Sequence, residues 1–234
     1  MKGIIICSDD EYFTNSLIEE VIKSIRSKFN IRIERCYIIK DYFDFNRTYK
    51  TLLILGLKGI IKLLKIQKKK LFDVCKKLDL QNYEYNEDTL VNDDFDIAFV
   101  FNSNKIFRKE LLDKTKFGFL NLHFGPLPFY RGIMPAFWQH FFNEKKLGIT
   151  YYKMDTGLDT GDILYQDKIE ILNSDNLVDI YYKGFKSSRE IIIKGIENLL
   201  NNQFIKQTTL SNEFSYFGMP KLSNIIKYKF KNVI

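Results

Sequence analysis

The sequence predicts an α/β protein with a Rossmann-like, mostly parallel sheet that carries helices on both faces. Short apolar runs typical of buried strands alternate with longer segments of helical periodicity. This alternation is characteristic of parallel sheets whose strands are joined by crossover helices. The chain has 234 residues and is 45% hydrophobic, which is enough for one large core. We expect one domain over residues 1–205 and a short extension over residues 206–234.

The first half of the chain begins with a clear strand–helix–strand pattern. Residues 3–7 predict a buried strand, residues 10–28 a helix, and residues 31–40 a second strand. After the first strand comes Ser-Asp-Asp rather than a glycine-rich turn, which argues against a dinucleotide fingerprint or a phosphate loop. A sheet of this type therefore does not imply a nicotinamide cofactor.

The segment 51–70, TLLILGLKGIIKLLKIQKKK, is the one candidate for contact with a membrane. Lys58, Lys62 and Lys65 interrupt it well before the roughly 18 apolar residues that a membrane-spanning helix needs. We expect a helix that lies on the core, with an interfacial membrane helix as the alternative. The prediction is no stable membrane insertion and no sedimentation with liposomes.

The second half continues the alternation up to a long helix. Pro135 suits the first turn of the helix around it, and Asn173 or Ser174 is the expected cap of the last one. The final thirty-odd residues are aromatic and basic without clear periodicity. The expected elements are strands at 96–101, 117–123, 148–154 and 163–171 and helices at 105–115, 132–143 and 175–200.

Charge and cysteine content narrow the class of protein. The formal net charge is +7, which favours anionic partners, although a lysine-rich composition shared by the whole source proteome explains it equally well. The three cysteines are far apart and odd in number, which predicts buried thiols in a reducing, cytoplasmic compartment. The N-terminal apolar run is too short for a signal peptide. No Cys or His pair has metal-ligand spacing, and the acidic loop DTGLDTGD lacks the calcium-loop pattern, so we expect no metal.

The stretch NLHFGPLPFYRG carries the first candidate site residues. In a strand over 117–123, Asn121 and His123 point to the same face at its C-terminal end, where open parallel sheets bind ligands. A neutral histidine accepts a proton from an attacking amine, and an amide donates to an oxygen that becomes negative. The pair would therefore suit acyl transfer to nitrogen. Taken alone, such a pair is more often a histidine satisfied by a backbone group in a turn.

A second loop, MDTGLDTGD, joins two predicted strands and offers a carboxylate. Asp159 would lie near His123 if the strand before this loop neighbours the strand that carries the histidine. The alternative is a solvated turn, since Asp and Gly are common turn residues.

Together these motifs resemble the family of transferases that use 10-formyltetrahydrofolate. Asn-x-His is followed by LPFYRG, and GLDTGDIL places Asp159 36 residues after His123. The resemblance is strong over residues 96–166 and loose elsewhere. It implies a catalytic triad in which His123 takes the proton of the acceptor amine, Asn121 holds the formyl oxygen, and Asp159 supports the histidine through orientation or water.

The resemblance also implies a folate cleft. Its cofactor-binding residues would be Lys105, Ile106, Phe107, Met154 and Asp155, with N10-formyltetrahydrofolate as co-substrate. The chain departs from the family after the histidine, where many members have Pro-Ser-Leu-Leu-Pro and this chain has Phe-Gly-Pro-Leu-Pro. That difference makes the acceptor side less certain than the folate side.

For the acceptor, the resemblance is best to members that formylate a nucleotide-linked amino sugar, such as a dTDP-4-amino-4,6-dideoxyhexose for surface polysaccharide (lipopolysaccharide O-antigen) synthesis. Those members have a compact aromatic tail and often dimerise through C-terminal strands, so we expect a homodimer. Tyr216 and Phe217 would supply stacking surface and Arg131 would meet a pyrophosphate. Members acting on methionyl-tRNA add a longer C-terminal barrel, so we expect no nucleic-acid partner.

Other interpretations stay open. Methionyl-tRNA and glycinamide ribonucleotide are the alternative acceptors, and a non-catalytic folate- or nucleotide-binding module is the alternative to an enzyme. The second histidine, His140, falls on the side of its predicted helix away from the aromatic residues, so we expect a surface histidine without a catalytic role.

Overall fold

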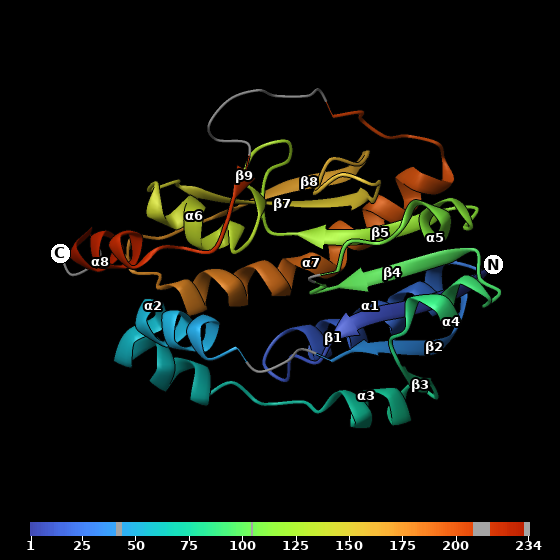
Figure 1. The fold of residues 1–234 in the computed structure, drawn as a ribbon, viewed down its shortest axis with the longest axis horizontal. Helices are drawn as coiled ribbons and strands as arrows, with labels where there is room; N and C mark the ends of the chain where they lie inside the picture. The colour runs from blue at the N-terminus through green and yellow to red at the C-terminus, as the bar shows by residue number, and fades with distance from the viewer. Residues whose placement is uncertain (41–43, 104, 208–215, 232–234) are drawn as a thin grey trace.

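The computed structural model describes residues 1–40, 44–103, 105–207 and 216–231. Its centre is a seven-stranded sheet with the order β3-β2-β1-β4-β5-β7-β8 (Figure 1). The strands from β3 to β5 run parallel, whereas β7 pairs antiparallel with both β5 and β8. The predicted α/β class with a mostly parallel sheet is therefore confirmed. The strands are β1 Lys2–Ser8, β2 Arg32–Ile39, β3 Gln81–Glu84, β4 Ile97–Phe101, β5 Gly118–His123, β7 Lys146–Lys153 and β8 Ile163–Glu170.

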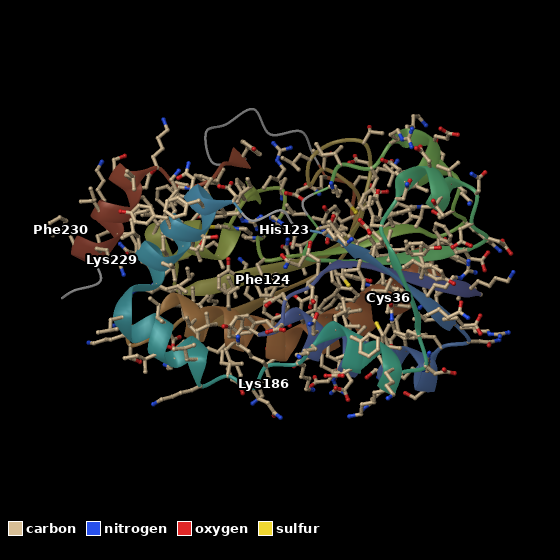
Figure 2. The ribbon with its side chains drawn as sticks, turned by 60° about the horizontal axis from the view of Figure 1, so that its bottom comes forward. Cys36, His123, Phe124, Lys186, Lys229 and Phe230 are labelled. Carbon is tan, nitrogen blue, oxygen red and sulfur yellow. The ribbon has the colours of Figure 1, made fainter. Side chains whose placement is uncertain are left out.

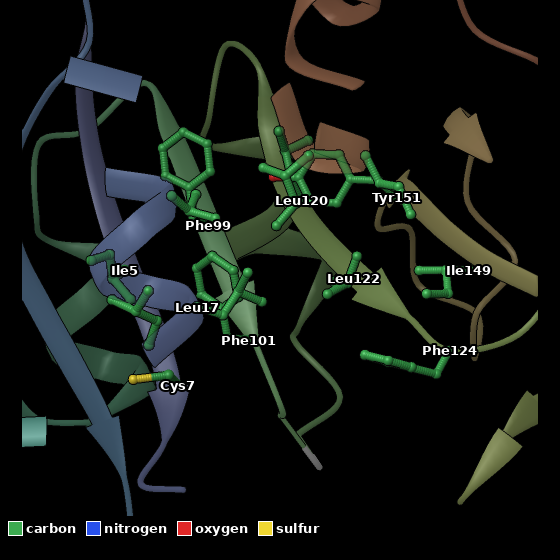
Figure 3. Close-up of a cluster of buried hydrophobic side chains, with 14 of the residues drawn as sticks. Ile5, Cys7, Leu17, Phe99, Phe101, Leu120, Leu122, Phe124, Ile149 and Tyr151 are labelled. Atoms are coloured by element: carbon green, nitrogen blue, oxygen red, sulfur yellow. The ribbon is translucent and has the colours of Figure 1, made fainter. Parts of the chain in front are cut away.

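Helices cover both faces of this sheet because its central strands are apolar on both sides. Ile5 and Phe99 belong to the larger buried cluster, which the helices α1, α3 and α7 complete (Figure 3). The alternate residues Ile4 and Ala98 belong to a second cluster with α4 and α5. Successive strand residues point to opposite faces, so one strand feeds both layers. These helices are α1 Thr14–Lys28, α3 Leu71–Lys77, α4 Glu87–Val91, α5 Lys109–Asp113 and α7 Leu177–Leu200.

Several helix ends differ from the predicted ones, and local hydrogen bonds explain two of them. The Asp10 carboxylate accepts from the backbone amides of Tyr12 and Thr14, so a turn precedes α1 and the helix begins at Thr14. The cap of α7 is Asn176, not Asn173 or Ser174, because Asn176 and Asp179 form a reciprocal capping box. Helix α5 spans only Lys109–Asp113, within the predicted helix over 105–115.

Helix α2, Phe45–Leu64, corrects the expectation for residues 51–70. It begins earlier, ends earlier, and is broken at Gly56, whose φ of +62° lies in the left-handed region that favours glycine. Only Ile54 and Gly59 of this helix are buried. The expectation of a helix that lies on the core holds in part, because Ile54 is buried and Leu53 and Leu55 pack against the larger cluster. The apolar side chains of this segment that are exposed are Leu52, Leu57, Ile61 and Leu64. Within the described parts of the chain, no helix is long and apolar enough to cross a membrane.

The C-terminal extension contains structure that the sequence pattern did not reveal. Strand β9, Tyr216–Phe217, pairs in parallel with β6, Arg131–Gly132, of the same chain. Helix α8, Leu222–Lys231, follows and buries Ile225 and Tyr228 at helical spacing. The expectation of no periodicity is wrong for this segment, whereas the homodimer remains a prediction.

Helix α6, Pro135–Phe141, begins with Pro135 in its first turn as predicted. His140 in this helix is buried, and its Nδ1 lies 2.8 Å from the Tyr228 hydroxyl of α8. The prediction of a surface histidine is wrong, because α8 covers this side of α6. All three cysteines are free and buried, as expected.

Candidate active site

The candidate site lies where the parallel strands end. Strand β5 places Asn121 and His123 at its C-terminal end, and its neighbour β7 leads into the loop that carries Asp159. Both His123 and Asp159 are buried, with 6% and 8% of their surfaces exposed. Figure 2 shows His123 near the middle of the molecule, far from the labelled residues of α8. The structure thus brings the three predicted catalytic residues to one place.

The His123 ring is held by a backbone carbonyl. Its Nε2 lies 2.8 Å from the carbonyl oxygen of Tyr130. A carbonyl oxygen only accepts hydrogen bonds, so Nε2 must carry the proton in the neutral ring. The other nitrogen, Nδ1, then has the free lone pair and lies 3.7 Å from Asp159 Oδ2. The proton-accepting atom of the histidine therefore faces the carboxylate.

Asp159 is fixed by two hydrogen bonds in a left-handed backbone conformation. Its φ is +54°, its Oδ2 accepts from the Gly132 amide at 2.7 Å, and its Oδ1 accepts from the Tyr152 hydroxyl at 2.8 Å. A non-glycine residue with positive φ costs energy and persists where the surrounding contacts hold it. The carboxylate is thus oriented by donors on both oxygens.

Tyr152 connects Asp159 to Asn121. The Asn121 amide nitrogen donates to the Tyr152 hydroxyl at 3.2 Å, while the amide oxygen is buried without a partner among the described residues. Burial and the nearby Asp159 carboxylate raise the pKa of Tyr152 well above its ordinary value, so this hydroxyl stays protonated. Tyr152 stands directly opposite Asn121 in the β5–β7 pairing. Sequence reasoning missed Tyr152, because the position of this hydroxyl beside Asn121 depends on strand register.

Glycine at position 125 is required by close approach to the histidine. A Cβ there would stand 2.6 Å from His123 Nε2 and 2.9 Å from the Tyr130 carbonyl oxygen. No side chain fits beside this hydrogen bond without moving the ring. The departure from the family pattern after His123 therefore includes a glycine in contact with the His123 ring.

A cleft of about 390 Å³ opens over these groups. It is lined by the predicted catalytic residues, by all five predicted cofactor-binding residues, and by Tyr216 of the predicted substrate residues. Arg131 and Phe217 do not line it. Phe217 instead stacks on Trp138 with ring centroids 5.0 Å apart. The five predicted cofactor-binding residues that line the cleft are Lys105, Ile106, Phe107, Met154 and Asp155.

The far side of the cleft contains residues that sequence reasoning missed. Arg47 of α2 and the aromatic residues Tyr181 and Phe185 of α7 line it, together with Thr14. Arg47 is exposed and forms no ion pair with any residue the structure describes. These helices are remote from the motifs in sequence, and only their packing brings them to the sheet edge. Within the described residues, no cluster of His, Cys, Asp and Glu could hold a metal ion.

Residues 63–196 match the model of the formyl transferase family. The chain belongs to this family. The match covers both the Asn-x-His strand and the loop of Asp159, so the resemblance expected from these motifs is confirmed.

Curated relatives in this family include methionyl-tRNA formyltransferases. That of Prochlorococcus marinus (strain MIT 9215) is 35% identical over 136 residues, which cover 55% of this chain and 42% of the relative. That of Clostridium perfringens (strain SM101) is 33% identical over 146 residues, covering 62% of this chain and 47% of the relative. This formyl transferase chain thus spans less than half the length of the relatives it matches.

Solved structures share the fold over a larger part of the chain. The sugar 3N-formyl transferase WlaRD is 20% identical with a TM-score of 0.66, covering 100% of this chain and 80% of that one. An N-formyltransferase from Helicobacter canadensis is 20% identical with a TM-score of 0.65, covering 100% and 81%. A glycinamide ribonucleotide transformylase from Symbiobacterium toebii is 13% identical with a TM-score of 0.65, covering 89% and 94%.

Proposed function

We propose that this formyl transferase moves a formyl group from N10-formyltetrahydrofolate to the amino group of a nucleotide-linked amino sugar. The observation that carries the proposal is the free Nδ1 of His123 facing Asp159, with Asn121 on the same cleft. A base, an oriented carboxylate and an amide are the groups that acyl transfer to nitrogen needs.

In the proposed reaction the acceptor amine attacks the formyl carbon, and a new C–N bond forms. The proton lost by the amine goes to His123 Nδ1, and the resulting cation is stabilised by Asp159 Oδ2 at 3.7 Å. An N–H of Asn121 donates to the formyl oxygen as it becomes negative. The bond between the formyl carbon and N10 then breaks, the proton held on His123 Nδ1 passes to N10, and tetrahydrofolate leaves with the histidine neutral again.

The folate side of the cleft is formed by two loops that follow β4 and β7, the strands on either side of β5. Residues 105–107 follow β4, and Met154 and Asp155 follow β7. Phe107 is buried and packs on Phe119, so it fixes this loop, whereas Ile106 is 72% exposed and free to meet a flat ring. Structures with this fold include WlaRD in the presence of dTDP and 5-N-formyl-THF.

The acceptor side suits a nucleotide carrier. Tyr216 is 51% exposed at the cleft and offers a stacking surface, and Arg47 offers a guanidinium to a phosphate. The N-terminus of α1, a common place for phosphate, already holds the Asp10 carboxylate. A phosphate would therefore be repelled there and drawn toward Arg47. A dTDP-4-amino-4,6-dideoxyhexose is our preferred acceptor, with surface polysaccharide synthesis as its use and a cytoplasmic homodimer as the form of the enzyme.

Methionyl-tRNA is the second candidate acceptor. The observation in its favour is the sequence match of 33–35% to two curated methionyl-tRNA formyltransferases. The net charge of +7 also favours a polyanion.

An acceptor panel tests the proposal. Purified protein is incubated with N10-formyltetrahydrofolate and, separately, with nucleotide-linked amino sugars, glycinamide ribonucleotide and charged initiator tRNA, and formyl consumption is followed. We expect turnover with an amino sugar and loss of at least about 100-fold in the His123→Ala variant. Turnover with charged initiator tRNA but with no amino sugar would identify methionyl-tRNA as the acceptor. Normal turnover by His123→Ala would refute the mechanism.

A further inference from the structure

The helices α2 and α8 lie side by side at one end of the molecule (Figures 1 and 2). The Lys229 amine of α8 donates to the Ile54 carbonyl of α2 at 2.8 Å, beside the break at Gly56. Together the two helices form what we call the α2–α8 surface. Its exposed large apolar residues are Phe45, Tyr49, Leu52, Leu57, Ile61, Leu64, Leu222, Ile226 and Phe230.

These apolar residues recur at helical spacing. On each side of Gly56 the exposed residues of α2 follow the i, i+4, i+7 pattern, and those of α8 follow i, i+4, i+8. Leu57 and Phe230 are each 74% exposed, and Leu64 is 67% exposed. Each helix thus has an apolar stripe turned to solvent as well as buried residues turned to the protein. Stripes of this kind mark an interaction surface.

The same segments carry a strong positive charge. Residues 45–70 contain eight Lys or Arg and no Asp or Glu, and residues 221–231 contain four Lys and no Asp or Glu. Some of these cations are paired, as Lys62 is with Asp179. Lys58, Lys65 and Lys227 are exposed and form no ion pair with the described residues.

Charge and apolarity together distinguish the kinds of partner. A second copy of this chain would bring two strongly basic surfaces together, which like-charge repulsion opposes. A nucleic acid would match the cations but leave the apolar stripes in water. An anionic lipid bilayer would bind both the apolar stripes and the cations, because the stripes enter the headgroup region while the lysines contact lipid phosphates.

We propose that the α2–α8 surface binds the face of an anionic lipid bilayer. The helices lie in the interface and do not cross it, in agreement with the absence of a membrane-spanning helix from the described part of the chain. This reverses the sequence-based expectation about liposomes, which assumed that the apolar side chains of residues 51–70 are covered. Arg47, which lines the cleft, belongs to α2, so a docked protein holds the mouth of its cleft beside the lipid.

Sedimentation with vesicles tests this proposal. The wild-type protein is mixed with vesicles of phosphatidylcholine alone, or with vesicles that also contain about 30 mol% phosphatidylglycerol, which gives them a negative surface potential. Two triple variants are compared, L57Q/L64Q/F230Q and K58Q/K65Q/K227Q. Glutamine is a good helix former, so both sets preserve the helices. The control F204Q/I205Q removes two exposed apolar residues that follow the C-terminal end of α7 and lie outside the α2–α8 surface.

We expect binding to the anionic vesicles only, weakened about 10-fold or more by either triple variant and unchanged in the control. Circular dichroism and turnover with the soluble acceptor confirm that each variant is folded. Failure of the wild type to bind anionic vesicles overturns the proposal. So does binding that the apolar variant leaves unchanged, especially if a short RNA competes, which would indicate a nucleic-acid surface. A dimer in light scattering that the apolar variant dissociates would indicate self-association instead.

Discussion

The Nε2 of His123 donates to the Tyr130 carbonyl at 2.8 Å, and this contact decides which nitrogen of the neutral ring has the free lone pair. Tyr130 itself has a left-handed φ of +58° and closes the loop that follows β5. The loop that follows β5 therefore selects the tautomer of His123, the last residue of that strand. Because Nδ1 is then free and faces Asp159, proton transfer in the proposed reaction depends on the loop and the carboxylate together.

Asp159→Asn removes the negative charge of this side chain but keeps its size and one hydrogen-bond acceptor. The asparagine oxygen still accepts from the Gly132 amide, but it cannot stabilise a protonated His123. We expect kcat to fall by about 100-fold while the affinity for folate changes less than about 2-fold. Steady-state kinetics and equilibrium binding of 5-formyltetrahydrofolate separate the two effects. A fall in folate affinity with unchanged kcat would assign Asp159 to binding instead.

Gly125→Ala tests the fixed position of the ring. The added methyl would come within 2.6 Å of His123 Nε2, so the ring must leave the Tyr130 carbonyl. We expect kcat to fall at least about 10-fold, since small displacements of catalytic groups are costly. Gly218→Ala is the matched control, because nothing lies within 4 Å of a Cβ there. Equal activity of the two variants would show that the contact with the ring is unimportant.

The meeting of the three candidate catalytic residues was predictable because strand periodicity and loop position locate them. Asn121 and His123 share a strand face by alternation, and Asp159 follows from the adjacency of β5 and β7. The position of Tyr152 depends on register, which a sequence pattern fixes only weakly when both faces are buried. The position of Arg47 depends on how α2 packs against α7 and α8. Tertiary packing is not encoded in local periodicity, and so these two were missed.

Two adjacent tyrosines give a paired test of the buried network. Tyr152→Phe removes the hydroxyl that links Asn121 to Asp159. The Asn121 amide nitrogen and Asp159 Oδ1 each lose that hydrogen-bond partner. We expect a loss of about 1–3 kcal/mol in the free energy of unfolding and a lower kcat. Tyr151→Phe removes a buried hydroxyl that has no partner among the described residues. It should leave stability unchanged or raise it.

Urea denaturation of both variants measures the difference directly. A Tyr151→Phe variant as unstable as Tyr152→Phe would mean that loss of any hydroxyl from β7, rather than the hydrogen-bonded link, is what costs stability.

His140 predicts a pH dependence of stability near neutrality. Burial lowers the pKa of His140 below its ordinary value of 6.5, against a weaker opposite effect of Asp175. Below pH 6.5 the unfolded chain therefore binds a proton that the folded protein does not, and stability falls as the pH drops toward the folded pKa. The slope for one such group is at most about 1.4 kcal/mol per pH unit.

His140→Gln keeps a polar partner for the Tyr228 hydroxyl but does not titrate. We expect the wild type to lose more stability than this variant between about pH 7 and 5.5, in thermal or urea denaturation at fixed ionic strength. Because Tyr228 belongs to α8, the protection factors of the α8 amides, corrected for the intrinsic exchange rate at each pH, should fall with pH in the wild type more than in the variant. Parallel pH curves for the two proteins would show that His140 binds its proton equally in the folded and unfolded states.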